Sequence, residues 1–589
     1  MKIFRAAAFC LVFFFASFIP LLSLAAEGQI QVVIDGIEGD EFANVRTALA
    51  IPPGLVSRDG VVDTRWLKNF ERQAPRKARE ALQPFGFYDP LVTVSSEKSQ
   101  DGLHKIRISI DPREPVRVTG LSVRVEGPGS DERRIAEIIR AFPLNVGDVL
   151  RQDKYENAKK EIRSKAVELG YLNADFSTHV IRLSPPELRA EIDLVLETGP
   201  LYYFGQVNFS GASLYPSSFF GRYLAFKAGD VFSHLKIGQT QRNLINADRF
   251  SEVVIHADQE AASDHRVPVG IKLTPSKPKR LRMGIGFETD IGVKGTVKYR
   301  DVNFLRTSHE FESAMDISEN LKVLGLRYVM PDHKDIGGFT SLGFSARRED
   351  HRAFFTETMT AEWERTRTIG RNMTGSAFLQ LMHERSDAGD EETNTFSLLP
   401  GFRLSAISYD NMVRPTRGYR YSMEFKGTHQ TLGSHIGLAQ VVADGGLVIP
   451  LPARFTLLTR ARIGSTTLND ATVELPIALR FFAGGDQSVR GYRYKSLGPQ
   501  DANGDVVGGK NLLVGSIELE RAIGENWGLA LFYDTGNAFN NFSDISLAQG
   551  AGAGIRYYSP IGPFKLDVAR QMDEKNSDFR IHLSVGFNL

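Results

Sequence analysis

Arg490 is the residue whose type and surroundings most suggest a specific chemical task. It stands between Val489 and Gly491 in the glycine-punctuated stretch GGDQSVRGYRYKSLGP, residues 484–499. A guanidinium keeps its proton at physiological pH and offers a fork of N–H donors, so a buried arginine needs carboxylates that accept them. The chemistry expected here is ion pairing, and the sequence must supply the carboxylates.

Two later segments supply such carboxylates if they form β-strands. In GSIELERAI the apolar residues Ile517 and Leu519 alternate with a second set, Glu518 and Glu520. In ALFYDTGNAF, Leu531 and Tyr533 alternate with a second set, Phe532 and Asp534. Successive side chains of a strand point to opposite faces, so the second set of each segment shares one face. We therefore expect Arg490 to lie against Phe532 and to pair with Asp534 and Glu518.

Patterns typical of enzymes are incomplete in this chain. The stretch GDVVGGKN, residues 504–511, approximates a phosphate-binding loop, but Asn511 replaces the required Ser or Thr. His383-Glu384 lacks the second histidine of a zinc protease because Asp387 stands there, and no G-x-S-x-G occurs. We predict no enzymatic activity, no catalytic residue and no cofactor.

A calcium-loop pattern is also incomplete. The sequence DANGD begins at Asp501, yet Val506 and Leu512 occupy the glycine and final glutamate positions. A polar loop explains the stretch better than a metal at Asp501, Asn503 and Asp505, which is the minor alternative. We predict no metal site.

Length and charge limit the class of protein. A chain of 589 residues is too long for one hydrophobic core, so several domains are expected. Its 71 basic and 70 acidic residues leave a net charge of +1. That balance argues against nucleic acid as a partner.

The N-terminus predicts export. Lys2 and Arg5 precede a long apolar run that ends in small residues at Ala26, the layout of a secretory signal peptide over residues 1–26. An uncleaved membrane anchor is the alternative. Cys10 is the only cysteine and lies inside the run, so no disulfide or thiolate chemistry is expected in the mature chain. Without a later transmembrane run, the expected destinations are the periplasm, the medium, or an outer membrane crossed by a closed barrel.

The N-terminal half contains an internal repeat with a spacing of about 80 residues. FPLNVGDVLRQDKYENAKKEI and LAFKAGDVFSHLKIGQTQRNL place Gly147 and Gly229 in matching contexts, and an aromatic opens a strand at Phe87, Tyr171 and Phe250. Three copies of strand-helix-helix-strand-strand are expected, over residues 27–113, 114–199 and 200–276. Three unrelated α+β domains are the alternative. The arrangement resembles POTRA domains, the periplasmic modules of outer-membrane assembly and secretion proteins.

The second copy carries the clearest helix signal. Apolar residues recur at steps of three and four over Tyr155, Ala158, Ile162, Ala166 and Leu169. Gly170 follows where a helix-ending residue is expected.

Residues 277–589 change to strand periodicity. In RGYRYSMEFKGT apolar positions alternate with charged or polar ones, and similar runs recur to the C-terminus. Alternation alone fits a soluble sandwich, with its apolar face inside, or a membrane barrel, with its apolar face outside. At roughly 10 residues per spanning strand plus a comparable share of turns, the region holds about 16 strands. We expect a transmembrane antiparallel β-barrel after three α+β repeats.

Arg490 and its neighbours carry the most specific resemblance. They are similar to the Val-Arg-Gly-Tyr loop of the outer-membrane assembly factor superfamily that includes BamA, TamA and the two-partner secretion transporters, and the resemblance extends to YDNMVRPTRGYRYSMEF, ALFYDTGNAF and GAGAGIRYYSPIGPFKLDVA. It implies that the loop folds back into the barrel lumen as a latch. The expected latch residues are Val489, Arg490, Gly491 and Tyr492, and their expected partners are Glu518, Phe532 and Asp534. A second Arg-Gly-Tyr, residues 417–419, is expected only to open a strand.

Three repeats directly after the signal are most similar to the TamA group of this superfamily. The resemblance implies an outer-membrane protein with periplasmic repeats that helps to assemble or export autotransporters and other outer-membrane proteins, with a TamB-like inner-membrane-anchored partner. A dedicated two-partner secretion transporter for one substrate is the alternative within the superfamily. A passive porin or receptor would share the barrel but has no reason to keep three periplasmic repeats.

The seam that closes the barrel is expected between LRMGIGFETD and FRIHLSVGFNL. Gly284 and Gly286 interrupt the first strand and Gly586 the last, and glycine weakens a strand. Phe587 and Leu589 are the final anchors, where superfamily members commonly end on an aromatic. We predict that this seam has fewer strand-to-strand hydrogen bonds than any other and opens sideways towards lipid, so that an incoming strand can replace the lost bonds.

The repeats are also expected to offer open sheet edges. An unpaired edge binds an extended segment through backbone hydrogen bonds and makes little demand on its sequence. We predict such an edge at EVVIHA, residues 252–257, or at its counterparts in the other repeats.

Overall fold

A computed structural model describes residues 30–51, 64–98, 104–370, 372–388, 391–411, 414–470, 474–559, 562–573 and 577–585. The signal peptide expected at residues 1–26 lies outside this part of the chain. Within it, no helix is both long enough and apolar enough to cross a membrane. Contacts divide the chain into two compact units, 1–206 with 228–235 and 259–268, and 207–227 with 236–258 and 269–589.

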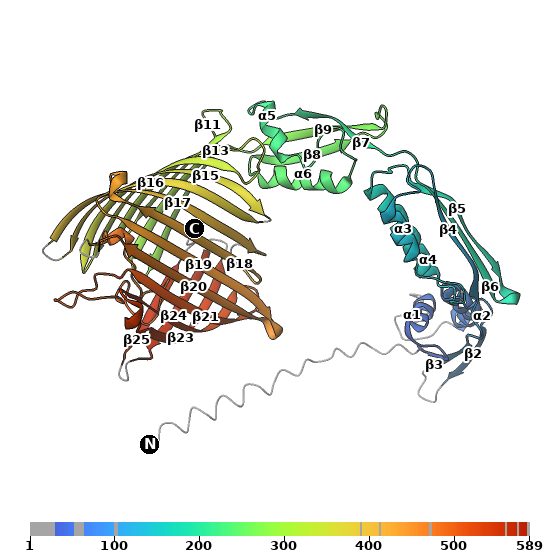
Figure 1. The fold of residues 1–589 in the computed structure, drawn as a ribbon. Helices are drawn as coiled ribbons and strands as arrows, with labels where there is room; N and C mark the ends of the chain where they lie inside the picture. The colour runs from blue at the N-terminus through green and yellow to red at the C-terminus, as the bar shows by residue number, and fades with distance from the viewer. Residues whose placement is uncertain are drawn as a thin grey trace, which may run out of the picture. The chain divides into compact units, whose positions relative to one another are not determined.

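The first repeat is a three-stranded sheet packed against two helices (Figure 1). Its central strand β3 (His104–Asp111) pairs in parallel with β1 (Ile30–Asp35) and antiparallel with β2 (Leu91–Lys98). The helices are α1 (Gly39–Ala48) and α2 (Thr64–Leu82), and the 3-10 turn η1 (Gln83–Phe85) follows them. Alternate residues of β3 are buried against the apolar face of α2, so the two periodicities meet in one core.

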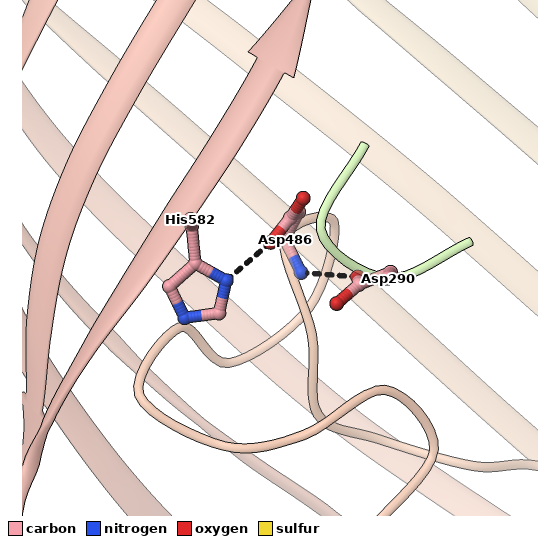
Figure 2. A group of neighbouring side chains, drawn as sticks. All are labelled: Asp290, Asp486 and His582. Carbon is pink, nitrogen blue, oxygen red and sulfur yellow. Dashed lines mark hydrogen bonds and ion pairs between the residues drawn. The ribbon is translucent and has the colours of Figure 1, made fainter. Parts of the chain in front are cut away.

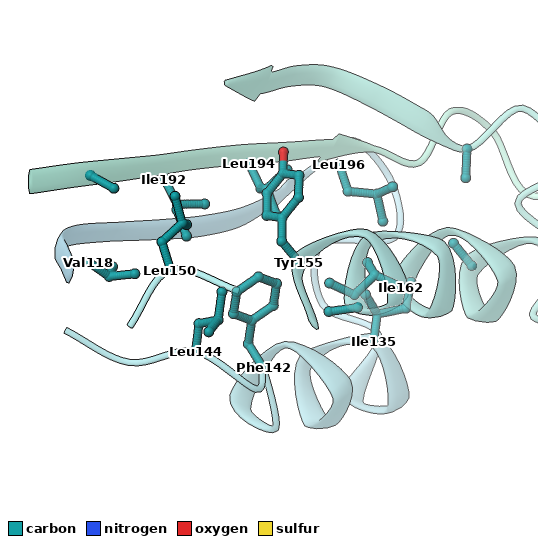
Figure 3. Close-up of a cluster of buried hydrophobic side chains, with 14 of the residues drawn as sticks. Val118, Ile135, Phe142, Leu144, Leu150, Tyr155, Ile162, Ile192, Leu194 and Leu196 are labelled. Carbon is teal, nitrogen blue, oxygen red and sulfur yellow. The ribbon is translucent and has the colours of Figure 1, made fainter. Parts of the chain in front are cut away.

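The second repeat has the same plan. Its elements are β4 (Arg117–Glu126), α3 (Arg133–Arg140), α4 (Gln152–Glu168), β5 (Asp175–Ser184), η2 (Pro185–Glu187) and β6 (Arg189–Glu197), with the strand order β4-β6-β5. Figure 3 shows Tyr155 and Ile162 of α4 beneath Leu194 and Leu196 of β6. The predicted apolar face of α4 is buried, and the helix ends before Gly170, whose φ of +101° favours glycine. The helix prediction is confirmed.

The third repeat contains β7 (Tyr203–Ser210), α6 (His234–Asn246), β8 (Phe250–Ala257) and β9 (Arg266–Pro275), in the strand order β7-β9-β8. Of the two helices expected in this repeat, the first is only the single turn α5 (Ser217–Phe220) followed by the 3-10 turn η3 (Gly221–Tyr223). Four aromatic rings of this segment pack on one another, so ring packing rather than helical hydrogen bonding organises it: Tyr215, Phe219, Phe220 and Tyr223.

The two Gly-Asp-Val sequences make equivalent hydrogen bonds, which explains why they recur. Gly147 donates its N–H to Val118 O at 2.8 Å, and Gly229 donates to Phe204 O at 2.8 Å. Val118 and Phe204 each lie in or beside the first strand of their repeat, and both glycines have a positive φ. The sequence repeat is therefore a repeat of structure.

The C-terminal region is a closed antiparallel barrel of 16 strands. Its strands are β10 (Lys279–Glu288), β11 (Gly292–Phe304), β12 (His309–Ile317), β13 (Leu321–Pro331), β14 (Phe339–His351), β15 (Phe354–Gly370), β16 (Met373–Ala388), β17 (Glu391–Tyr409), β18 (Gly418–Thr428), β19 (Leu438–Leu451), β20 (Phe455–Leu468), β21 (Asn511–Ile523), β22 (Trp527–Phe539), β23 (Ala548–Ser559), β24 (Gly562–Gln571) and β25 (Phe579–Val585). The expected fold of three POTRA-like repeats followed by a barrel of about 16 strands is confirmed.

The barrel is apolar outside and polar inside. Ile285 is 86% exposed and Leu531 63% exposed on the outer face, whereas Glu384, Asp534 and Arg556 are buried in the interior. A soluble sandwich has the opposite arrangement. The structure therefore has the membrane-barrel pattern of the two that the sequence left open.

Two buried arginines fasten the end of the third repeat to the barrel within the second unit. Arg222 donates from Nη2 to Asp335 O at 2.9 Å and to Ile336 O at 2.7 Å, both in the turn after β13. Arg249, 2% exposed, donates to Val302 O and forms an ion pair with Glu310 at 2.7 Å. These contacts bind the repeat to strands β11 to β14.

Candidate functional site

The segment between β20 and β21 packs inside the barrel. Residues 474–510 of this segment are called the inserted loop below. Its backbone bridges to itself between Phe481 and Gly509 and between Ala483 and Leu497. Val489, fully buried, packs with apolar residues that β21 and β22 direct inward.

Glu384 on β16 holds the start of the inserted loop. Its two carboxylate oxygens accept the N–H groups of Ile477 at 2.7 Å and Ala478 at 2.8 Å, in the first turn of η6 (Ile477–Leu479). These N–H groups open a helical turn and have no partner within it. The His383-Glu384 pair, incomplete as a zinc motif, thus contains a carboxylate that anchors a loop.

Arg490 is 4% exposed and surrounded by acceptors. It binds Asp534 with two nitrogens, Nε to Oδ2 at 2.7 Å and Nη2 to Oδ1 at 2.9 Å. Its Nη1 donates to Glu518 at 2.8 Å and to Asp567 at 3.1 Å. The guanidinium also lies 3.4 Å from the centroid of the Phe532 ring. The bidentate contact and the stacked ring require the planar fork of arginine, which lysine lacks.

A second guanidinium completes the cluster. Arg556 on β23, 1% exposed, donates from Nη2 to Glu518 at 2.8 Å and from Nη1 to Asp567. Ser516 donates to Asp534 at 2.5 Å. Two cations and three carboxylates are therefore linked by hydrogen bonds, and the loss of one buried cation would leave the carboxylates uncompensated.

Strand register brings the partners together. Ser516 lies opposite Asp534, and Glu518 lies opposite Phe532, where β21 pairs with β22. All four side chains point inward because residues two apart on a strand share a face. The inserted loop places Arg490 against these inward-facing side chains.

The residues after Arg490 are held by the last strands. Gly491, with a φ of +97°, donates its N–H to His582 Nε2 at 2.9 Å and accepts a hydrogen bond from Gln571 at 3.1 Å. Tyr492 donates its hydroxyl to Asp573 at 2.8 Å. The expected stretch from Val489 to Tyr492 is thus fixed at all four residues.

Other motifs of the sequence lie apart from this cluster. Asp501 accepts the N–H groups of Asn503 and Asp505 at 2.9 Å each, a turn that uses its carboxylate within the loop. The second Arg-Gly-Tyr leads into β18, and the N–H of Arg417 donates to Asp410.

The described residues show how β10 meets β25 at the seam of the barrel. Among the described residues it contains two pairs, Phe287 with Val585 and Glu288 with Ser584. The described part of the last strand ends at Val585, so the weakness of the seam relative to other strand pairs stays a prediction.

The seam glycines have different surroundings. A Cβ at Gly286 would meet Val585 O at 2.7 Å, so this glycine allows the two strands to approach, whereas a Cβ at Gly284 would meet nothing within 4 Å. Gly586, Phe587 and Leu589 lie outside the described residues.

The inserted loop bridges the seam from inside (Figure 2). Asp486 in the loop accepts a hydrogen bond from His582 Nδ1 on β25 and donates its own N–H to Asp290, just after β10, at 2.7 Å. These three residues are called the clasp below. Burial, reinforced by the Asp486 carboxylate, raises the pKa of Asp290 to about 7.

The clasp has the composition of a metal site, since one ligand atom from each residue lies within 4.8 Å of the others. The histidine tautomer argues against a metal. The N–H of Gly491 points at Nε2, so a neutral His582 carries its proton on Nδ1, the nitrogen that faces Asp486. Nδ1 then donates to Asp486 and has no lone pair for a cation, so the clasp is a hydrogen-bonded bridge.

Three family comparisons match successive parts of the chain. A model described as the Omp85 superfamily domain matches residues 303–588. Over these residues the barrel is similar to the domain of that superfamily. A model described as POTRA domain TamA domain 1 matches residues 31–112, and one described as a surface antigen variable number repeat, of the POTRA type, matches 122–198 and 202–276.

Relatives of this chain carry the name outer membrane protein assembly factor BamA. One from Nitratidesulfovibrio vulgaris is 20% identical over 541 residues, which cover 83% of this chain and 64% of the relative. One from Neisseria meningitidis serogroup B is 20% identical over 576 residues, covering 86% and 71%. The chain thus spans somewhat less than two thirds of the first relative. The crystal structure of BamA from Haemophilus ducreyi lacking POTRA domains 1–3 has the same fold, with a TM-score of 0.65 at 16% identity over 80% of this chain and 99% of that one.

Sequence reasoning missed several residues of the barrel lumen. Arg556 and Asp567 belong to the Arg490 cluster, and the parity that selected Glu518 also marks them: Ile555 and Leu566, their neighbours, are exposed outward. The clasp left no comparable signal because its residues lie far apart in the chain.

Proposed function

We propose that this chain is the outer-membrane component of a translocation and assembly module, a TamA-type protein. It assists the insertion and secretion of autotransporters and other outer-membrane β-barrel proteins. The match of the first repeat to a TamA-type POTRA model supports the TamA group over others in the superfamily.

The seam is the observation that carries this proposal. Two residue pairs join β10 to β25 in the described chain, and the clasp adds side-chain bonds from one loop. An incoming strand that pairs with a freed edge replaces each lost backbone bond with a new one, so the exchange costs little. No nucleotide is needed for such an exchange.

The outward apolar face supports a location in the outer membrane, with the repeats in the periplasm. A TamB-like protein anchored in the inner membrane is the proposed partner, bound through a repeat. Substrates are nascent outer-membrane proteins, and the surrounding lipid bilayer is the third contact.

The Arg490 cluster is proposed to act as a latch that holds the inserted loop while the seam opens. The cluster binds the loop to β21 through β24, on one side of the seam, so the loop stays in place when the clasp releases β10. Without these ion pairs, the inserted loop would no longer be held in one position inside the lumen.

The test deletes the gene in its host and measures surface display of several unrelated autotransporters. A second strain carries the full-length chain with a tag, and that chain is recovered after cross-linking. Reduced display of several substrates, with a TamB-like protein cross-linked to the repeats, supports the proposal. Loss of one secreted protein only would identify a dedicated two-partner transporter. Unchanged display together with steady ion conductance in planar bilayers would identify a porin.

A further inference from the structure

A polar cavity lies at the end of the barrel where β10 finishes. Its volume is about 430 Å³. The lining comes from the turns after β10, β12 and β14, from the inserted loop and from β25. The cavity is separate from the Arg490 cluster and shares only Asp290 with the clasp.

Three arginines that form no ion pair with a described residue line this cavity. They are Arg352 after β14, Arg493 in the inserted loop and Arg580 on β25. In the part of the chain that the structure describes, none of the three side chains forms an ion pair or a hydrogen bond. The Nε of Arg580 is buried and has no partner, although a buried donor is costly to leave unsatisfied.

Several other arginines of the barrel interior form ion pairs. Arg403 binds Glu424 at 2.8 Å, and Arg347 binds Glu349 at 2.8 Å. Guanidiniums that line one cavity repel one another, so their arrangement is stabilised when an anion enters.

The carboxylates of the lining do not cancel this charge. Glu349 already accepts bonds from Arg347 and from Lys495 at 2.6 Å. Asp290 has its pKa raised to about 7 by burial and by Asp486, so it carries only part of a charge near neutral pH. Asp350 is exposed and forms no ion pair with a described residue. An excess of positive charge therefore remains.

We propose that this cavity binds a phosphate-type oxyanion through Arg352, Arg493 and Arg580. A phosphate group offers three acceptor oxygens and up to two charges, which suits three guanidinium forks better than a single carboxylate does. The volume accommodates a phosphate together with part of the molecule that bears it. The phosphate is either free in solution or the headgroup of a lipid, and the proposal does not depend on the assembly function.

The experiment uses the full chain in detergent micelles at low salt, titrated with inorganic phosphate in a calorimeter. Arg580→Gln should weaken binding by about tenfold, as expected for a lost charge-assisted contact. The triple variant Arg352→Gln/Arg493→Gln/Arg580→Gln should abolish it. The control is Arg420→Gln, because Arg420 is an exposed barrel arginine outside the cavity and in no described ion pair.

A second arm identifies the source of the phosphate. The same proteins are placed in nanodiscs of phosphatidylcholine with or without phosphatidic acid, and bound lipid is measured by native mass spectrometry. Retention of phosphatidic acid by the wild type and its loss in the triple variant assign the site to a lipid headgroup, while binding of inorganic phosphate alone assigns it to a soluble anion. Equal binding by wild type and triple variant, or binding of neither probe by the wild type, overturns the proposal. Heat-dependent gel mobility verifies that each variant is a folded barrel.

Discussion

The guanidinium of Arg490 lies flat against Phe532, 3.4 Å from the ring centroid, while it binds Asp534 with two nitrogens. The ring and the carboxylate together fix both the plane and the direction of the fork. Lysine has the same charge but no planar fork of donors, so it cannot both bind Asp534 through two nitrogens and stack on Phe532. The latch is therefore expected to depend on arginine itself.

Arg490→Lys should behave almost like Arg490→Ala. Both leave Asp534 and Asp567 without their bidentate or bridging partner, and breaking a buried ion pair costs about 3–5 kcal/mol. We expect an inserted barrel with a mobile loop and reduced display of autotransporters at normal protein levels. Arg417→Ala, in the second Arg-Gly-Tyr, is the matched control. Full display activity of Arg490→Lys would show that the latch is not needed.

A disulfide across the seam should stop substrate assembly. Glu288 and Ser584 face each other next to Thr289 and Leu583, whose backbones are hydrogen bonded, so they form a non-hydrogen-bonded pair with closely spaced Cα atoms. We expect Glu288→Cys/Ser584→Cys to assemble substrates only when reduced. Assembly at the same rate in both redox states would rule out lateral opening.

The control for this experiment is a disulfide elsewhere in the barrel. Ser405 and Ser422 lie opposite each other on β17 and β18, and serine is close in size to cysteine. Ser405→Cys/Ser422→Cys should assemble substrates equally well when oxidised and reduced.

The stability of the clasp should fall as pH rises. The pKa of Asp290 is raised from 3.8 to about 7, so between these values the folded state holds more protons than the unfolded state. Stability therefore decreases through this window and levels off above pH 7. Heat-dependent gel mobility at pH 5 and pH 8 should show the decrease in wild type and a smaller one in Asp290→Asn. Asp350→Asn, at an exposed carboxylate, should keep the wild-type slope, and an equal slope in Asp290→Asn would contradict the assignment.

Proline substitutions in β8 should weaken partner capture at alternate residues. β8 is an edge strand, so each second N–H of residues 252–257 points away from β9. Proline there removes a donor for an incoming strand but no bond within the sheet. Cross-linking of the full chain to its periplasmic partner should drop at those residues. Unchanged capture for every position would locate the contact elsewhere.

Much of the architecture could be predicted because it depends on local periodicity. The steps of three and four from Tyr155 to Leu169 describe a helix face, and the alternation from Ile517 to Asp534 describes strands whose inner residues meet Arg490. These signals lie within one element or between neighbouring strands. A repeat of about 80 residues then multiplies the same local pattern.

The clasp could not be predicted because it depends on closure. Asp290, Asp486 and His582 come together only after the first and last strands meet and the loop enters the lumen. Their sequence separations carry no period. The short first helix of the third repeat was missed for another reason, since the apolar spacing around Phe219 and Phe220 serves ring packing as well as it would serve a helix.

Only residues 276–278 separate β9 of the third repeat from β10, the strand that meets β25 at the seam. Arg222 and Arg249 hold the neighbouring part of that repeat to β11 through β14, so it cannot swing freely. A force applied to β8 or β9 is therefore transmitted to β10, because the linker between the repeat and the barrel is too short to extend. In a single-molecule pulling experiment with a handle on β8, we expect the β10–β25 pairing to rupture before any other barrel pair. A periplasmic partner that pulls on the third repeat would then open the seam of the barrel without contacting it.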